Sequence, residues 1–224
     1  MNRKQMNAEA QKLVQKAVEK IDDNPNEVRS YYELSVLLTE LKDYEQAKQL
    51  LLKASGLFSG KTELDLLNYG LGNVLYSAGD FQKAINYFRV VKGTKLNDNA
   101  ILMIAQCEYA LGDYKRSLAY ALTTRNVGAK QLIASNFLAL GDFQNARKYF
   151  DEVLANEPRN FDATFQRGII ALILDGKEQA DSYFEIAQKI DYKSFIKMKG
   201  QIIDIQKTII AKQKGESIGF AKYE

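Results

Sequence analysis

Few residues of this chain have the chemistry to catalyse a reaction or to hold a metal ion. It contains no histidine and a single cysteine, Cys107. Without histidine there is no Ser-His-Asp or Cys-His nucleophile, no imidazole acid or base and no histidine metal ligand. One thiolate does not make a zinc site, and no glycine-rich phosphate-binding loop is present. Its lysines and carboxylates carry no catalytic signature, so we expect no enzymatic activity, no cofactor and no metal.

The composition is that of an ordinary folded chain with an uneven distribution of charge. The 224 residues are 46% hydrophobic and 26% charged, with a net charge of +3. Residues 192–224 carry seven lysines against three carboxylates, so the rest is nearly neutral, unlike a nucleic-acid-binding protein. The N-terminus is polar and no apolar run approaches the roughly 20 residues of a membrane span. A single cysteine cannot form an internal disulfide, so a cytoplasmic protein is the simplest expectation. The charge distribution predicts no nucleic-acid partner.

One short phrase recurs five times and points to the elements that position the side chains. Its copies are Leu41-Lys-Asp-Tyr-Glu-Gln-Ala47, Ala78-Gly-Asp-Phe-Gln-Lys-Ala84, Leu111-Gly-Asp-Tyr-Lys-Arg-Ser117, Leu140-Gly-Asp-Phe-Gln-Asn-Ala146 and Leu174-Asp-Gly-Lys-Glu-Gln-Ala180. The intervals between the closing small residues are 37, 33, 29 and 34. Periods of this length are typical of a repeat array.

The phrase predicts a tight helix–turn–helix. Glycine can adopt the left-handed conformation that ends one helix, and the aspartate beside it can cap the next. A second small residue lies 12 positions before each closing one, at Ser35, Gly72, Ala105, Ala134 and Gly168. Small residues on both helices predict a close approach within each hairpin.

This pattern resembles the tetratricopeptide repeat (TPR) family. The copies most similar to the family pattern contain Leu71-Gly72, Phe81, Ala84 and Phe88, and then Ala134, Phe137, Ala146, Phe150 and Pro158. The sequence departs from that pattern in having no tryptophan, in Glu108 replacing an aromatic and in Arg167 replacing a leucine. The resemblance implies an all-α solenoid of five helix-turn-helix repeats over residues 27–192. The short interval of 29 predicts a missing helical turn and irregular stacking at residues 123–129.

Single helices are expected on both sides of the repeats. Residues 1–26 are predicted to contain a helix at 8–21. Ala10 precedes Ala47 by 37 residues, so this helix corresponds to the second helix of a degenerate leading repeat. Residues 193–224 contain an amphipathic helix at 194–213 followed by a frayed tail. Gly200 follows Gly168 by 32, so this helix reads as the first half of a sixth repeat that caps the array.

In the TPR family the first helices of the hairpins line a concave groove. Carried over by position, the resemblance implies a mostly neutral, tyrosine-rich binding face. Its residues would be Tyr32, Tyr69, Asn73, Tyr76, Leu102, Met103, Gln106, Tyr109, Gln131, Ser135 and Phe165. Of the amide and cationic positions with which some relatives clamp acidic chaperone tails, only Asn73 is matched, so that ligand is not expected.

The leading functional hypothesis is therefore a non-enzymatic scaffold that binds a peptide or helix of another protein in this groove. Two alternatives remain open. The chain could self-assemble into a homo-oligomer through its C-terminal helix, or act as a membrane-peripheral assembly factor through the lysines of that helix. A capping role for the helix is favoured over membrane binding.

Overall fold

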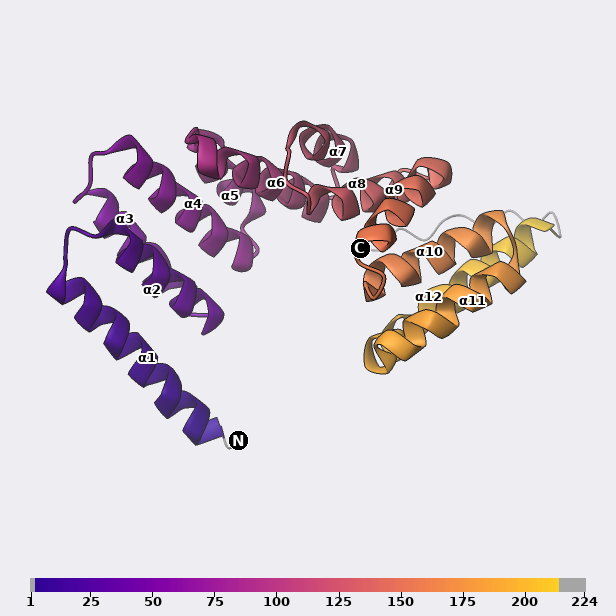
Figure 1. Cartoon of the computed structure of the whole chain (residues 1–224), viewed down its shortest axis with the longest axis horizontal. Helices are drawn as coiled ribbons and strands as arrows, with labels where there is room; N and C mark the ends of the chain where they lie inside the picture. The colour runs from indigo at the N-terminus through magenta and orange to yellow at the C-terminus, as the bar shows by residue number, and fades with distance from the viewer. Residues whose placement is uncertain (1–2, 214–224) are drawn as a thin grey trace. The chain divides into compact units, whose positions relative to one another are not determined.

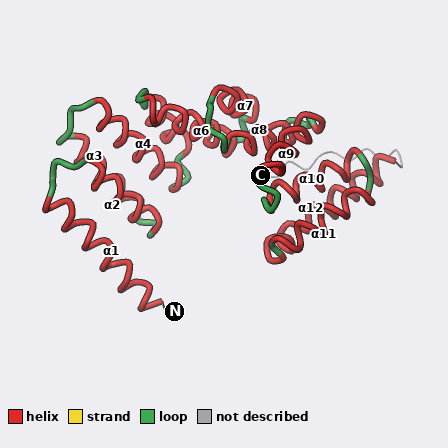
Figure 2. Tube along the Cα trace, viewed as in Figure 1, coloured by secondary structure: helices red, strands yellow, loops and turns green. Residues whose placement is uncertain are grey.

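The computed structural model describes residues 3–213, which fold into twelve α-helices joined by short connections (Figures 1 and 2). No strand occurs within this range. The helices are α1 Arg3–Asp23, α2 Val28–Glu40, α3 Tyr44–Ser55, α4 Lys61–Ser77, α5 Phe81–Val90, α6 Thr94–Ala110, α7 Tyr114–Thr123, α8 Ala129–Ala139, α9 Phe143–Asn156, α10 Phe161–Leu174, α11 Lys177–Ile190 and α12 Tyr192–Gln213. The predicted all-α fold of helical repeats is confirmed. The five hairpins pair α2 with α3, α4 with α5, α6 with α7, α8 with α9 and α10 with α11.

The turn chemistry of the phrase accounts for four of the five hairpins. In α3, α5, α7 and α9 the N-cap aspartate accepts a hydrogen bond from the backbone N–H three residues later. The preceding residue has a left-handed φ at Lys42 (63°), Gly79 (83°), Gly112 (79°) and Gly141 (79°). The left-handed conformation disfavours a residue with a Cβ by about 1–2 kcal/mol, so the first turn, at Lys42, is the strained one.

The fifth turn has the two residues in the opposite order, Asp175-Gly176. Gly176 has a φ of 97° and occupies the N-cap of α11, where no side chain caps the helix. Asp175 instead forms an ion pair with Arg147 of α9, with 2.5 Å between Nη2 and Oδ2. The expected aspartate cap is therefore missing here, because the swap places the carboxylate before the glycine.

Small residues on the first helix allow a close approach of the two helices in the second, third and fifth hairpins. A Cβ added at Gly72 would lie 2.5 Å from the ring of Phe88, and one at Gly168 would lie 2.6 Å from the ring of Phe184. In the third hairpin the Ser117 hydroxyl donates to the Ala105 carbonyl across the contact, at 2.8 Å. A larger side chain at any of these positions would push the two helices apart.

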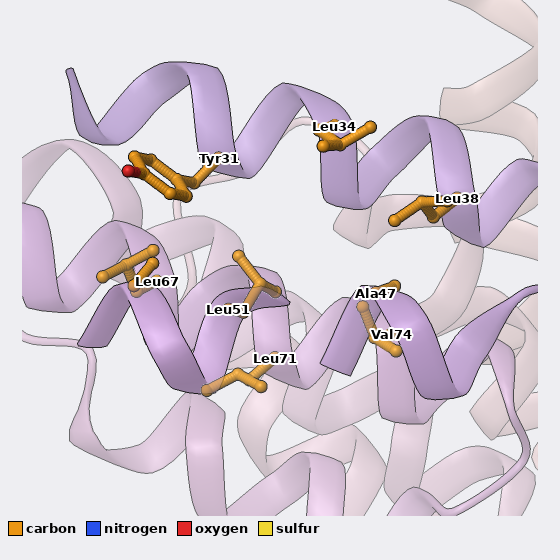
Figure 3. Close-up of a cluster of buried hydrophobic side chains, with 9 residues drawn as sticks. Tyr31, Leu34, Leu38, Ala47, Leu51, Leu67, Leu71 and Val74 are labelled. Carbon is orange, nitrogen blue, oxygen red and sulfur yellow. The ribbon is translucent and has the colours of Figure 1, made fainter. Parts of the chain in front are cut away.

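The helices form two compact units, residues 1–129 and 130–224, each with its own core. In the first, Tyr31, Leu34 and Leu38 point from α2 toward apolar side chains of α3 and α4 (Figure 3). A second cluster of this unit surrounds Phe88 between α5 and α6. The second unit has clusters around Phe150 and around Phe165. The boundary falls inside the block predicted as 27–192, and the proposed division into 1–26, 27–192 and 193–224 stays a prediction.

Two of the departures from the family pattern, Glu108 and Arg167, place charges in the interior, and both are paired. Arg167 is 7% exposed; its Nε lies 2.7 Å from Asp151 Oδ1, and its guanidinium lies 4.8 Å from the ring centre of Tyr183. Glu108 is 2% exposed and pairs with Arg116 at 3.0 Å. Such pairing offsets the cost of removing these charges from water.

The connection between the third and fourth repeats, residues 124–128, is held by polar contacts. The Thr124 hydroxyl donates to the Asp98 carbonyl at 2.8 Å, and the Asn126 amide donates to Asn99 Oδ1 at 2.7 Å. Helix α8 has 11 residues, whereas α2, α4, α6 and α10 have 13, 17, 17 and 14. The short interval therefore corresponds to a shortened helix, as predicted, and the irregular stacking stays a prediction.

The flanking helices are both present; α1 has 21 residues where a helix at 8–21 was predicted, and α12 begins two residues before the predicted 194–213. Helix α1 packs on α2 and places Val14, Ala17 and Ile21 against the first core cluster. Helix α12 packs on α10 and α11 through Phe195 and Ile202. The tail expected to fray, residues 215–224, lies outside the described residues.

Candidate functional site

The predicted binding face of the first unit is built from α2, α4 and α6. Six of its residues are partly exposed: Tyr32, Tyr69, Tyr76, Met103, Gln106 and Tyr109. Asn73 is partly exposed as well and lies one turn after Tyr69 on α4. The structure thus places seven predicted side chains where a ligand can reach them.

A hollow of about 280 Å³ lies between α2 and α4. Its lining includes Tyr32 and Asn73, together with Ser35, Val36, Thr39, Glu40, Gly70, Val74 and Ser77. Gly70 allows the two helices to approach, because a Cβ there would lie 3.0 Å from Leu51 and 3.1 Å from Tyr32. The hollow has the shape to seat a side chain or a short peptide segment.

Tyr32 and Asn73 line this hollow, and Tyr69 hydrogen-bonds with the Asn73 side chain beside it; we call these three residues the Asn73 cluster. Burial raises the pKa of the Tyr32 hydroxyl, and hydrogen bonding with the Asn73 side chain partly opposes the rise. Burial also raises the pKa of Tyr69, with Tyr32 adding to the shift and Asn73 again opposing it. Both phenols therefore stay neutral at physiological pH and can donate as well as accept hydrogen bonds.

Rings of the second helices hold the tyrosines of this face in place. The ring centres of Tyr69 and Phe88 are 5.7 Å apart, those of Tyr76 and Phe81 are 5.4 Å apart, and those of Tyr109 and Tyr114 are 5.2 Å apart. All three pairs are edge-to-face, an arrangement that favours aromatic contact. Side chains fixed in this way lose little conformational entropy when a partner binds.

Two predicted groove residues belong to the interior instead. Phe165 is completely buried among the rings of Phe184 and Phe195, so the expectation that it contacts a partner is wrong. Leu102 is 9% exposed and packs inside the first unit. Large apolar side chains at these two positions are buried in this chain, as apolar helix residues usually are.

In the second unit the two remaining predicted residues are partly exposed and already engaged in local hydrogen bonds. Gln131 Oε1 accepts from the Asn160 amide at 3.0 Å, and the Ser135 hydroxyl donates to the Gln131 carbonyl at 3.0 Å. These polar groups are therefore less available to a ligand than the Asn73 cluster.

Several lining residues of the hollow were not among the predicted site residues. Thr39, Glu40 and Ser77 lie at the C-terminal ends of α2 and α4. Thr39 and Ser77 lie seven and four residues after Tyr32 and Asn73, spacings that share a helical face, but only the meeting of α2 and α4 makes these positions part of a hollow. Glu40 is the one charged residue of the described lining, which gives the hollow a negative edge.

Comparison with known proteins places the repeats in a family. The tetratricopeptide repeat family matches residues 28–58, 69–126 and 132–191. The chain belongs to this family. The resemblance carried by the Gly-Asp phrases is thereby confirmed, and a search of curated protein sequences gives no significant match.

Solved structures of TPR proteins share the fold at low sequence identity. The crystal structure of YrrB, described as a TPR protein with an unusual peptide-binding site, has a TM-score of 0.59 and 19% identity and covers 83% of this chain and 97% of its own. MamA from Desulfovibrio magneticus RS-1 has a TM-score of 0.62 and 16% identity, covering 75% and 96%. The C-terminal part of a TPR repeat-containing protein from Cytophaga hutchinsonii has a TM-score of 0.64 and 16% identity, covering 91% and 83%. At these identities the likeness extends to the fold alone.

The described residues also limit the other kinds of site. None of the described helices combines the length and apolar character needed to cross a bilayer. No group of three or more Cys, Asp or Glu side chains within residues 3–213 is arranged to hold a metal ion.

Proposed function

We propose that this TPR protein is a non-enzymatic scaffold that binds a segment of another protein on the first-helix face of residues 1–129. The observation that carries the proposal is the hollow between α2 and α4, with Tyr32 and Asn73 in its wall and Tyr69 hydrogen-bonded to Asn73 beside it. An amide and two phenols offer donors and acceptors that match the backbone of a bound peptide. The neighbouring rings offer apolar contact area.

The lining indicates the chemistry of the bound segment. Val36 and the tyrosine rings suit an apolar or aromatic side chain, and Glu40 favours a basic residue beside it. An acidic tail is disfavoured because the described lining contains no cation. YrrB is described as having a peptide-binding site, which supports the same ligand class here.

Capture experiments with paired variants test this proposal. We expect replacement of Tyr69 and Tyr109 by alanine to weaken partner capture by more than about thirtyfold, since two lost tyrosine contacts commonly cost over about 2 kcal/mol. Asn73→Leu should weaken capture while leaving the core intact. Leu122→Ala, an exposed change on α7, is the control. The measurement is quantitative pull-down with cross-linking mass spectrometry, after circular dichroism has shown that each variant is folded.

The outcome also separates groove binding from a membrane role of α12. Groove capture should depend weakly on salt, because the face carries few charges. A membrane-peripheral protein would instead co-sediment with anionic vesicles. Replacement of Lys197, Lys199 and Lys207 would abolish this vesicle binding, and replacement of the tyrosines would leave it unchanged. A folded tyrosine double variant that still retrieves every wild-type partner would refute the groove proposal.

A further inference from the structure

Helix α12 leaves a row of three isoleucines uncovered. Ile196, Ile203 and Ile210 are 48%, 44% and 51% exposed and follow one another at intervals of seven residues. That spacing keeps them on one side of the helix, whereas Phe195 and Ile202 on another side are buried in the core. Gly200 lies beside the row, and a Cβ added to it would meet no atom within 4 Å.

The repeat register identifies this row. Gly200 occupies the position of Gly72 and Gly168, the small residues against which a second helix packs in a complete hairpin. Ile203 lies three residues later, where the equivalent residues Leu38, Leu75 and Ala171 are buried. The row is thus the surface through which a first helix contacts the second helix of its own hairpin. Within residues 3–213, α12 has no such second helix.

Helix α1 corresponds to a second helix, and within residues 3–213 it lacks the first helix of its hairpin. Ala10 occupies the position of Ala47, the small residue of a second helix, and α1 packs on α2 as the second helix of a preceding repeat would. Leu13 lies three residues after Ala10, and in complete hairpins Tyr149 and Tyr183 at that position contact the first helix. Leu13 is 54% exposed. Within the described chain, α1 is therefore a second helix without a first.

We propose that α12 of one copy and α1 of the next copy pair as a hairpin, so that the protein assembles head to tail. Each helix then supplies the partner that the other lacks within residues 3–213, and the Gly200 and Ala10 positions form the small-residue contact that Ala105 and Ser117 make in the third hairpin. This self-association is separate from partner binding on the first-helix face. Its surfaces are continuous with established packing, since α1 already contacts α2 and α12 already contacts α10 and α11.

Charge supports α1 as the occupant. In the second hairpin Asp65, seven residues before Gly72, lies 2.8 Å from the Cβ position of Gly93, nine residues after Ala84. In the third hairpin Asp98, seven residues before Ala105, accepts from the backbone N–H of Arg125, eight residues after Ser117, so the contact falls one residue earlier there. The corresponding residues of the proposed hairpin are Lys193 and Glu19, which carry opposite charges.

Other occupants fit the row less well. Two α12 helices packed on each other would bring Lys193, Lys199 and Lys207 of both copies together, which like-charge repulsion opposes. A membrane surface calls for a broad apolar face, whereas this row is one residue wide and fits along a single partner helix. One helix pair is a small interface, so the association should be weak and depend on concentration. Because the two contacting surfaces differ, it can continue into filaments or close into rings.

The mass of the full chain in solution tests the association. We expect light scattering to show a rising average mass between about 10 and 500 µM protein, a range in which weak complexes form. Ile203→Asp should raise the concentration needed at least tenfold, and Val90→Asp, at a similarly exposed position on α5, should not. A wild-type mass that stays at one chain throughout would overturn the proposal, as would equal effects of the two variants. Circular dichroism establishes that both variants fold.

Disulfide trapping tests which helices meet. Cys107 is buried, so a cysteine introduced at the surface is the reactive thiol. Chains carrying Ala10→Cys, mixed with differently tagged chains carrying Gly200→Cys, should give a mixed disulfide dimer under mild oxidation. Leu122→Cys chains in place of either should give at least tenfold less. A Gly200→Cys dimer that forms as readily as the mixed product would instead assign the contact to two α12 helices and overturn the proposal.

A charge exchange tests the register. Lys193→Glu and Glu19→Lys should each weaken the association, and the chain carrying both changes should regain most of it. Failure of the double variant to recover would rule out the proposed pairing of these two residues.

Discussion

The Asp65 carboxylate accepts a hydrogen bond from the Lys92 backbone N–H at 3.2 Å, which ties the start of α4 to the residues that follow α5. One repeat later Asp98 Oδ1 accepts from the Arg125 backbone N–H at 3.3 Å. Both ties span 27 residues and join the two helices at the end of the hairpin opposite the Gly-Asp turn. An aspartate therefore closes the open end of two successive hairpins.

Removal of the Asp65 tie should destabilise the first unit. Asp65 is 5% exposed, and Asp65→Ala would leave the Lys92 N–H without its acceptor, at a cost of about 1–3 kcal/mol in the free energy of unfolding. Asp65→Asn keeps an acceptor oxygen and should cost less. Urea denaturation measures the difference, and an alanine variant with an unchanged midpoint would show that the tie contributes nothing.

Gly72→Leu should be more damaging to the fold than Tyr69→Ala. At Gly72 even a Cβ would come within 2.5 Å of Phe88, so leucine must separate α4 from α5 at a cost of about 3 kcal/mol or more. Gly200→Leu is the matched control, because the space there is open and leucine favours a helix over glycine. Thermal melts of dilute protein rank the three variants. The reverse order of Gly72→Leu and Tyr69→Ala would mean that the repeat register is wrong.

Hydrogen exchange should be fastest, apart from the chain ends, at residues 123–129. The five residues after α7 are held by hydrogen bonds such as that of Asn126 to Asn99, rather than by a hydrophobic core. Asn126→Ala should speed exchange there further, since it also removes the acceptor of the Gly128 N–H. Uniform protection across residues 115–140 would contradict this expectation.

Alkaline pH should destabilise the protein through Cys107. Burial raises the pKa of this thiol to about 12, from an ordinary value of 9.0. The thiol ionises in the unfolded chain first, so stability is complete below pH 9.0 and is lost as the pH rises toward 12. Cys107→Val lacks this ionisation. Between pH 8 and 10 the free energy of unfolding of Cys107→Val should therefore fall by about 1 kcal/mol less than that of the wild type. Urea denaturation at the two pH values measures both falls. Equal falls in both proteins would show that the thiol plays no part.

The hairpins could be predicted from the sequence because each follows from local chemistry. Gly79 ends one helix and Asp80 beside it caps the next, and Gly72 marks where α4 meets Phe88 of α5. These rules require only neighbouring residues and helical spacing. The all-α repeat fold was predictable for that reason.

The binding face was predictable only in part, because position in a repeat does not determine exposure. Tyr69 and Phe165 occupy equivalent positions, yet the ring of Phe165 is enclosed by Phe184 and Phe195. Both rings contact the phenylalanine 19 residues later, so the difference lies 30 residues away, where Phe195 follows Phe165 and the smaller Asn99 follows Tyr69. Glu40 and Ser77 were missed for a related reason, since the hollow forms where two helices meet and neither helix reveals it alone.

The ion pair between Asp175 and Arg147 gives the fifth turn a dependence on the fourth repeat. In α5, α7 and α9 the cap is made within one turn of helix and would survive in an isolated hairpin. The fifth turn instead obtains its polar partner from a residue 28 positions earlier. Disorder in α9 would therefore spread to the turn between α10 and α11, so this part of the chain should gain and lose its order cooperatively.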